Sequence, residues 1–316
     1  MRTLVTGAAG FIGSHLSRKL VQDGHEVVGI DNFDPYYSEK LKKLNLRELK
    51  KFKKFQFANI DITNLKDLEK IMKGIDLVYH LAARPGVMPS FFVPEVYHRN
   101  NVVGTFNVLF VARNTGVKKV LFCSSSSVYG QAVYLPMDEN HPLNANSPYG
   151  VTKIIAEKYC LIFDTIYKLP VNIVRLFSVY GPSQRPDLSI AEWTEDIFKR
   201  KKVIARRGLE QTRSYTYIDD TVDGIVAAMN ADFHGEIINI GSPVRIPVKL
   251  VVNKLIELSG IGNVKIEVHK RPDEDRLDTH ANIRKAKRLL HWKPKTKIDE
   301  GLKNYVEWRK KNRKLF

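Results

Sequence analysis

Cysteine is scarce in this chain, since only Cys123 and Cys160 are present among 316 residues. Two cysteines cannot build the disulfide framework of a small secreted scaffold, and no cysteine or histidine spacing typical of a metal site surrounds them. The N-terminus also lacks the charged start, apolar stretch and cleavage site of a secretory leader. The sequence therefore predicts a reduced, cytoplasmic protein without a bound metal.

Long hydrophobic runs are missing as well. Hydrophobic residues make up 43% of the chain, yet none of the apolar segments approaches the roughly 20 residues that a membrane span needs. Low-complexity linkers and internal repeats are also absent. The composition predicts a globular chain of one or two domains that does not associate with membranes.

Acidic residues are too few to balance the basic ones. There are 34 Asp and Glu against 51 Lys and Arg, which leaves a net charge of +17. A basic surface attracts nucleic acid, but no signature of an RNA- or DNA-binding module accompanies these lysines. We interpret the charge as a lysine-rich solvated surface that also attracts an anionic substrate, and we expect no nucleic-acid partner.

Short apolar runs alternate with helical segments across the first half of the chain, a pattern typical of stacked β-α-β units. The runs are apolar throughout, which predicts a parallel sheet covered by helices on both faces, a doubly wound α/β fold. The expected strands are Thr3–Thr6, Glu26–Ile30, Phe55–Ala58, Leu77–Leu81, Val120–Ser124 and Asn172–Phe177, and the expected helices lie near 12–23, 64–73, 98–115 and 148–168.

The pattern changes after Pro182. We expect residues 1–182 to form a nucleotide-binding domain and residues 183–316 to form a smaller α/β lobe that is partly interleaved with it. Residues 38–54 look like a basic amphipathic helix that packs beside the second strand. The expected elements of the second half are helices near 191–201, 219–230, 248–259 and 282–290 and an extended segment at Ile237–Ile240.

A glycine-rich turn follows the first strand, in the order Gly7-Ala-Ala-Gly10-Phe-Ile-Gly13 before a helix. Glycines permit a tight turn and a close approach of the backbone to a pyrophosphate at the helix N-terminus. Asp31 ends the next strand, where an acidic side chain binds the adenosine ribose and repels a 2′-phosphate. Together they favour NAD over NADP. Asp61 and Ile62, after the third strand, could contact the adenine, although Asp61 suits an ordinary surface position nearly as well.

Tyr149 and Lys153 stand four residues apart in the segment that Ser147 and Pro148 begin. Serine is a good helix N-cap and proline suits the first helical position, so both side chains project from one face of a new helix. A lysine ammonium beside a phenol favours the phenolate, which makes the tyrosine a proton acceptor. The pair alone also fits an ordinary amphipathic helix.

Several motifs follow in a fixed order that resembles the extended short-chain dehydrogenase/reductase superfamily, in its nucleotide-sugar epimerase/dehydratase branch. The resemblance covers nearly the whole chain. Its motifs are Thr6-Gly-Ala-Ala-Gly-Phe-Ile-Gly-Ser14, His80-Leu-Ala-Ala83, Asn101-Val-Val-Gly-Thr105, Ser124-Ser-Ser-Ser-Val-Tyr-Gly130, Tyr149 to Lys153, Arg175-Leu-Phe-Ser-Val-Tyr-Gly-Pro182, Arg213-Ser-Tyr-Thr-Tyr-Ile-Asp-Asp220 and Trp292-Lys-Pro294.

This resemblance implies a Rossmann-like N-terminal domain that retains NAD tightly through each turnover, and a C-terminal lobe that binds a UDP-sugar. Ser125, Tyr149 and Lys153 become the catalytic residues, although Ser125 alone could simply satisfy a backbone group at a strand end. Relatives often dimerise through two helices that correspond to 98–115 and 148–168, whose apolar faces also suit a buried core. The implied cofactor-binding residues are Gly7, Gly10, Phe11, Ile12, Gly13, Asp31, Asn32, Asp61, Ile62, Leu81, Ala82, Ala83, Asn101, Tyr149 and Lys153.

The two residues after Ser125 decide the reaction that the resemblance implies. Similar 4,6-dehydratases carry an Asp-Glu pair there, and UDP-glucuronate decarboxylases carry a glutamate at the second position. This chain has Ser126 and Ser127, which leaves simple 4-epimerisation through a 4-keto sugar. A non-catalytic NAD-binding regulator and a net oxidoreductase with exchangeable cofactor are the alternatives from other classes.

The sugar is less strongly indicated. Ser178 and the Arg185-Pro-Asp187 sequence resemble UDP-glucuronate 4-epimerases, and an arginine fork suits a carboxylate or phosphate. An ion pair within the loop explains Arg185 equally well. Met88 stands where those epimerases usually have arginine, so UDP-glucose remains the alternative substrate. The candidate substrate-binding residues are Ser125, Ser126, Ser178, Arg185, Arg213 and Arg276, the last two with a surface salt bridge as competing explanation.

Overall fold

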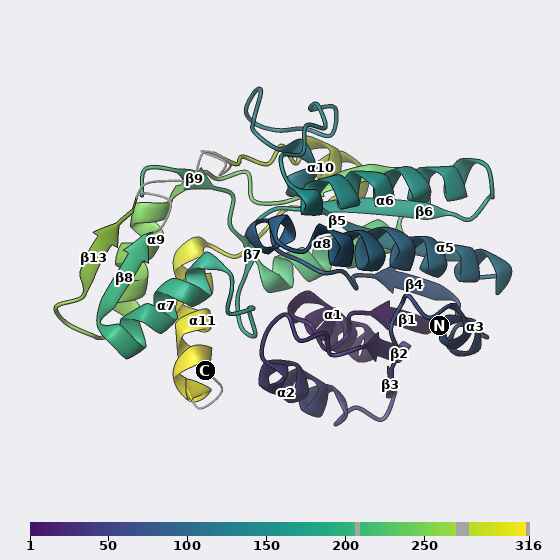
Figure 1. Ribbon diagram of the computed structural model, residues 1–316, viewed down its shortest axis with the longest axis horizontal. Helices are drawn as coiled ribbons and strands as arrows, with labels where there is room; N and C mark the ends of the chain where they lie inside the picture. The colour runs from purple at the N-terminus through teal and green to yellow at the C-terminus, as the bar shows by residue number, and fades with distance from the viewer. Residues whose placement is uncertain (206–208, 270–277, 314–316) are drawn as a thin grey trace.

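The computed structural model describes residues 1–205, 209–269 and 278–313. Its centre is a seven-stranded sheet in which all neighbouring strands run parallel (Figure 1). The predicted α/β class with a parallel sheet is confirmed. In spatial order the strands are β11 (Ile237–Ile240), β6 (Val171–Leu176), β5 (Lys119–Ser125), β4 (Leu77–His80), β1 (Arg2–Thr6), β2 (Glu26–Asp31) and β3 (Phe55–Asn59).

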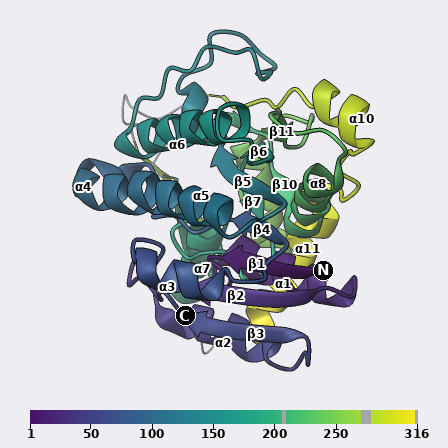
Figure 2. The same cartoon turned by 90° about the vertical axis from the view of Figure 1, so that its right-hand side faces the viewer.

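Helices cover both faces of this sheet (Figure 2). Neighbouring side chains of a strand point to opposite faces, so Val5 belongs to one hydrophobic core and Leu4 to the other, and both are fully buried. This is why the strands are apolar without alternation. One face carries α1 (Phe11–Gln22), α2 (Glu39–Leu49) and α8 (Ile218–Asn230), and the other carries α3 (Leu65–Ile71), α5 (Gly104–Asn114) and α6 (Pro148–Thr165).

The helix predicted near 98–115 is confirmed, but its first part is not a regular α-helix. The structure has a short α4 (Pro94–Tyr97), a π-helical segment η2 (His98–Val103) and then α5. The π-helical segment contains Asn101, whose carbonyl oxygen accepts a hydrogen bond from the Thr105 hydroxyl. A local π-helix inside an otherwise helical stretch is a feature that often lies near functional sites. The predicted helix at 38–54 is also shorter, because it ends at Leu49.

The second half of the chain builds a lobe beside the sheet, at the left of Figure 1. Its helices are α7 (Ser189–Arg200), α9 (Val248–Ser259) and α11 (Ile298–Lys311), and strand β8 (Lys202–Ala205) pairs with β13 (Lys265–Val268). The α11 helix and the β8–β13 pair were not predicted. The remaining elements are η1 (Met88–Phe91), η3 (Ser126–Tyr129), β7 (Val179–Tyr180), which pairs with β10 (Thr216–Tyr217), β9 (Thr212–Arg213), which pairs with β12 (Ile246–Pro247), and α10 (Arg284–Leu290).

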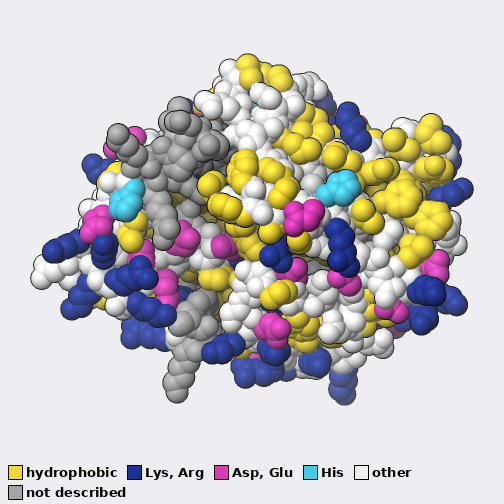
Figure 3. Space-filling model, in the orientation of Figure 1, with side chains coloured by type: hydrophobic (Ala, Val, Ile, Leu, Met, Phe, Trp, Pro, Cys, Tyr) yellow, Lys and Arg dark blue, Asp and Glu magenta, His cyan; other side chains and the backbone are white. Residues whose placement is uncertain are grey.

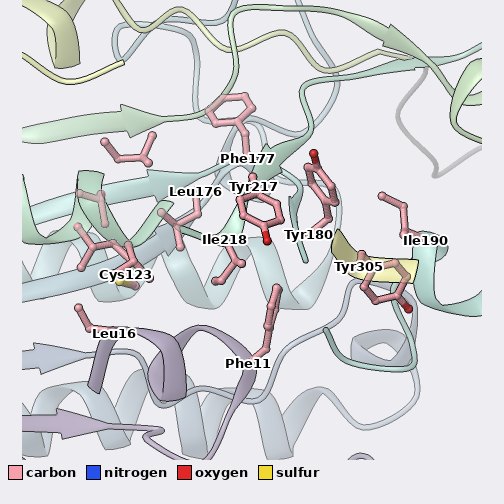
Figure 4. Close-up of a cluster of buried hydrophobic side chains, with 14 of the residues drawn as sticks. Phe11, Leu16, Cys123, Leu176, Phe177, Tyr180, Ile190, Tyr217, Ile218 and Tyr305 are labelled. Atoms are coloured by element: carbon pink, nitrogen blue, oxygen red, sulfur yellow. The ribbon is translucent and has the colours of Figure 1, made fainter. Parts of the chain in front are cut away.

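A cluster of buried side chains joins the lobe to the sheet (Figure 4). Phe11 of α1 lies in the same cluster as Tyr217 and Ile218 at the start of α8, and Ile190 of α7 and Tyr305 of α11 extend it into the lobe. All five side chains are at most 6% exposed. Burying one such side chain contributes about 1.5–3 kcal/mol, so this cluster holds the two halves in a fixed relation.

Two further features concern the surface of the molecule and the polarity of its helices. On the face in Figure 3, lysines and arginines are scattered, whereas hydrophobic side chains gather over α5 and α6. Within the described ranges, every helix is too short or too polar to cross a bilayer.

Candidate active site

A cleft with a cavity of about 750 Å³ opens at the carboxyl ends of the sheet strands, between the sheet and the lobe. Ligands of open parallel sheets bind at this edge because the strand ends and helix N-termini converge there. The lining combines the turn after β1, the loops after β2 and β4, the end of β5 and the start of α6 with Ser178, Arg185 and Arg213 from the second half. One cleft therefore collects most of the predicted site residues.

The glycine-rich turn forms one wall of the cleft. Gly7 has a positive φ of 73°, and its N–H donates to the carbonyl of Ile30 at 2.8 Å. A Cβ atom on Gly13 would lie 2.1 Å from the carbonyl oxygen of Gly7, so only glycine fits. Gly10 is the N-cap of α1 and makes no side-chain hydrogen bond to the helix, which leaves the first N–H groups of α1 for an anionic ligand. This cradle fits the pyrophosphate of a dinucleotide.

Asp31 ends β2 on the same wall and is 8% exposed. Its Oδ1 accepts a hydrogen bond from the Phe33 backbone at 2.8 Å, and Lys42 Nζ lies 3.5 Å away. The carboxylate therefore faces the cleft with one oxygen already engaged. This is the arrangement that a ribose-binding acid needs.

Two predicted cofactor-binding residues lie outside the cleft lining. Asp61 accepts from the Thr63 backbone and hydroxyl and from Asn32 Nδ2. Burial would raise its pKa, but these hydrogen bonds hold the pKa of Asp61 below its usual range. Asn101 is 1% exposed, and its amide bonds both backbone groups of Arg84 and the Thr152 hydroxyl. Both residues shape the loops behind the wall.

The loop after β4 is held by Thr6. Its hydroxyl oxygen accepts from the backbone N–H groups of Leu81 and Ala82, at 3.1 and 3.0 Å. Thr6 is also hydrogen-bonded to His80, and complete burial, with the charge of Lys153, lowers the pKa of His80 to about 3. A neutral imidazole thus supports the loop. The other predicted cofactor residues that line the cleft are Phe11, Ile12, Asn32, Ile62 and Ala83.

Ser125, Tyr149 and Lys153 line the cleft together. The Ser147 hydroxyl accepts from the Gly150 backbone at 3.1 Å and caps α6, as the sequence predicts. Lys153 is 3% exposed, and its Nζ donates to the carbonyl of Cys123 at 2.9 Å. Ser125 Oγ accepts from the Ser127 backbone at 3.1 Å. Within the described ranges, the Tyr149 hydroxyl has no hydrogen-bond partner, so it is available to a ligand.

A buried ionic network lies directly behind these residues, and the sequence analysis missed it. Arg175 of β6 donates from Nε and Nη2 to the two oxygens of Glu157 on α6, at 2.9 and 2.7 Å. Ser124 donates to the same carboxylate at 2.5 Å, and Tyr129 accepts from Arg175 Nη1 at 3.0 Å. Glu157 follows Lys153 by one turn of α6, so the network fixes α6 against the end of β5.

The described substrate-binding candidates also line the cleft. Ser126 and Ser178 line it, and Ser178 has a positive φ of 32°. Arg185 forms a two-point ion pair with Asp187, with both distances 2.9 Å. Arg213 donates to Gln211 Oε1 at 2.7 Å. Arg276 lies outside the described residues.

Several residues that line the cleft were not predicted to be site residues. Asp187 belongs to the Arg185-Pro-Asp187 sequence, which was noted for its resemblance, whereas Tyr36 was not singled out, and nothing in the sequence indicates that the two side chains meet. Trp193 and Tyr215 line the lobe side of the cleft without a sequence signal.

Comparisons with known proteins match nearly the whole of this chain. A family model described as GDP-mannose 4,6 dehydratase matches residues 4–305. A UDP-glucuronate 4-epimerase from Thermodesulfobacterium geofontis is 39% identical over 99% of this chain and 97% of its own length.

Solved structures give the same result. A UDP-glucuronic acid 4-epimerase from Bacillus cereus, in complex with UDP-glucuronic acid and NAD, is similar with a TM-score of 0.93 and 36% identity, over 98% of this chain and 99% of that one. A UDP-glucose 4-epimerase from Thermotoga maritima, with UDP-glucose, has a TM-score of 0.90 and 31% identity over 98% of this chain and 99% of that one.

Proposed function

This chain belongs to the NAD-dependent nucleotide-sugar epimerase and dehydratase family whose GDP-mannose 4,6-dehydratase model matches it, and from that premise we propose that it is an NAD-dependent UDP-sugar 4-epimerase acting on UDP-glucuronate. One observation carries the proposal. A single cleft brings the dinucleotide cradle at Gly7 to Gly13 together with Ser125, Tyr149 and Lys153. In this proposal residues 1–182 hold the cofactor, and residues 183–316 hold most of the UDP-sugar.

The reaction requires a reversible proton transfer at the sugar C4 hydroxyl. Tyr149 takes this proton as the carbonyl forms and returns it after the 4-keto sugar has turned over in the cleft. Ser125 hydrogen-bonds the same oxygen, and Lys153, one helical turn from Tyr149, holds the nicotinamide ribose. NAD, when bound, supplies the acceptor and later the donor of the C4 hydride. Because no net oxidation occurs, we propose that the cofactor stays bound between turnovers.

Epimerisation without elimination or decarboxylation is supported by the residues after Ser125. Ser126 and Ser127 both line the cleft, and neither is an acid or base that could remove a further proton. Ser127 is hydrogen-bonded to Ser125 through its backbone and its hydroxyl. Ser127 therefore positions Ser125, and both Ser126 and Ser127 offer hydroxyl groups to the sugar.

The choice of UDP-glucuronate rests on the polar side of the cleft and on the relatives. Ser126, Ser178 and Arg185 all line the cleft, and hydroxyl and guanidinium donors suit a carboxylate. Arg213 and Arg276 are proposed for the diphosphate. Met88 also lines the cleft and contributes no charge there, so these donors would carry the preference.

The test is an NMR assay of the purified protein with UDP-glucuronate and with UDP-glucose, without added NAD. We expect conversion of UDP-glucuronate to UDP-galacturonate to be the faster reaction. Tyr149→Phe should abolish turnover while NAD stays bound, because only the proton acceptor is removed. Full turnover by this variant would refute the mechanism, and preferred conversion of UDP-glucose would correct the substrate.

We further propose that the protein is a homodimer. An exposed apolar surface lies over α5 and α6 (Figure 3), defined here as the α5–α6 patch: Val103, Phe106, Val151, Ile162, Ile166 and Tyr167, which are between 37% and 69% exposed. Contiguous apolar surface of this kind marks interaction sites. Light scattering coupled to gel filtration should give twice the 36.2 kDa chain mass.

A cytoplasmic location is part of the same proposal. It is supported by the two buried cysteines, Cys123 and Cys160, which are both free thiols. Fractionation of the source cells tests it.

A further inference from the structure

Three loops from distant parts of the chain meet at Tyr36. Tyr36 lies in the loop after β2, and its hydroxyl donates to Oδ2 of Asp187, in the segment before α7, at 2.9 Å. Gly86, in the loop after β4, has a positive φ of 97°, and a Cβ atom there would lie 2.2 Å from the Tyr36 hydroxyl oxygen. Glycine at position 86 therefore leaves the space that the Tyr36 hydroxyl occupies when it bonds Asp187.

Two charged groups lie close to the ring of Tyr36. The guanidinium groups of Arg84 and Arg185 lie 4.9 and 5.8 Å from its centroid, distances at which a cation is attracted to an aromatic face. Each arginine is paired with an aspartate, Arg84 with Asp34 and Arg185 with Asp187. The Tyr36 backbone N–H donates to Asp34 as well, at 2.9 Å. The contact is thus a connected network.

The protonation states suit a lasting bond. Burial and the neighbouring Asp187 raise the pKa of Tyr36, so its hydroxyl remains a donor. Burial alone would raise the pKa of Asp187, but the Arg185 guanidinium and the Tyr36 hydroxyl hold it below its usual range. A neutral donor therefore faces a charged acceptor, the stronger kind of hydrogen bond.

We propose that Tyr36 and Asp187 form a clasp that closes the cleft and slows the release of NAD, and that Asp187 positions Arg185 for the UDP-sugar. The loop that carries Tyr36 begins directly after Asp31 and Asn32, and the Asp187 segment carries Arg185, so the bond joins a loop beside the predicted cofactor residues to the segment of a predicted sugar residue. Opening the cleft for cofactor exchange requires this bond to break. A ligand on Arg185 stabilises the same segment, which couples sugar binding to cofactor retention.

The role of Arg185 in this inference rests on the proposed function, whereas the clasp itself is tested without catalysis. Protein loaded with NAD is mixed with a large excess of isotopically labelled NAD, and the unlabelled NAD still bound is measured by mass spectrometry over time. Tyr36→Phe removes only the clasp hydroxyl, and we expect NAD to leave about tenfold faster, which corresponds to about 1.4 kcal/mol. Wild-type release in this variant would overturn the clasp.

Tyr37→Phe is the matched control. Tyr37 is the next residue and also lines the cleft, but its hydroxyl has no hydrogen-bond partner in the part of the chain that the structure describes. We expect NAD to leave this variant at the wild-type rate. Equal acceleration in both variants would indicate general loosening of the loop and overturn the proposal.

Asp187→Asn and the double variant complete the cycle. If the two side chains act through one bond, release from Tyr36→Phe/Asp187→Asn is no faster than from the quicker single variant, whereas multiplied effects would mean independent roles and contradict the clasp. Asp187→Asn should also raise the KM for UDP-glucuronate with little change in kcat, because Arg185 loses its positioning partner. If UDP-glucuronate slows NAD release from no variant but Tyr36→Phe still accelerates it, the clasp stands and the proposed coupling between UDP-glucuronate binding at Arg185 and NAD retention fails.

Discussion

Replacing Arg175 by methionine is expected to lower the free energy of unfolding by about 3–5 kcal/mol, because the variant leaves a buried carboxylate without its cation. The side chains of Arg175 and Glu157 are each only 2% exposed. Glu157 loses two charged hydrogen bonds, at 2.9 and 2.7 Å, and among the described residues it keeps only the one from Ser124. Each bond of this kind contributes about 1.5–3 kcal/mol, and relaxation of the surrounding side chains recovers part of the loss.

The comparison that makes this prediction specific is the double variant Arg175→Met/Glu157→Leu. Both buried charges are then replaced by apolar groups of similar size, which is often neutral or stabilising for a buried ion pair. We expect its stability to lie within about 1 kcal/mol of the wild type. The loss in the single variant thus comes from the uncompensated charge rather than from the lost contact itself.

Urea unfolding measures the free energy of unfolding of both variants. The NAD concentration must be equal in all samples, because bound cofactor adds to the apparent stability. A single variant that loses less than about 1 kcal/mol, or a double variant as unstable as the single one, would refute the reasoning.

Four further predictions follow from individual contacts. Full burial lowers the pKa of His80 to about 3, so below the unfolded value of about 6.5 only the unfolded chain takes up this proton and the group lowers stability by about 1.4 kcal/mol per pH unit. His80→Gln should flatten the pH dependence of urea unfolding between pH 6.5 and 4.5 by that slope, and an unchanged slope would contradict the assignment. Gly13→Ala places a Cβ atom 2.1 Å from the Gly7 carbonyl oxygen, so NAD affinity in calorimetry should fall at least about tenfold while circular dichroism stays the same. Phe106→Asp in the α5–α6 patch should give monomers in light scattering, and a persistent dimer would place the interface elsewhere. Arg185→Ala should reduce kcat/KM for UDP-glucuronate far more than for UDP-glucose, and equal losses would remove the carboxylate argument.

The positions of the central strands could be predicted from the sequence because their physical cause is local. A continuous apolar run bounded by glycine or charged residues suits only a buried parallel strand, and the first six strands begin and end within one residue of the expected positions. The glycine turn and the Ser147 cap are equally local, since each needs a residue type at a fixed offset.

Other features could not be predicted because their cause lies far away in the sequence. The π-helical segment around Asn101 bonds Arg84 and Thr152, and Tyr36 meets Asp187 across 151 residues. Helix α11 has a mostly polar sequence, and buried positions such as Leu302 and Tyr305 pack only against the completed lobe. The roles of Ser125, Tyr149 and Lys153 stay predictions until variants are assayed.

The place of β11 in the sheet has a consequence for biosynthesis. This strand pairs with β6, yet Ile237 follows Leu176 only after the whole of α7, β8 and α8. A chain emerging from the ribosome therefore exposes the unpaired backbone edge of β6 until that stretch has been synthesised. An exposed edge strand is a template for aggregation. A fragment that stops near Pro182 should share this weakness, so the nascent protein would depend on rapid translation or a chaperone to shield β6 until β11 arrives.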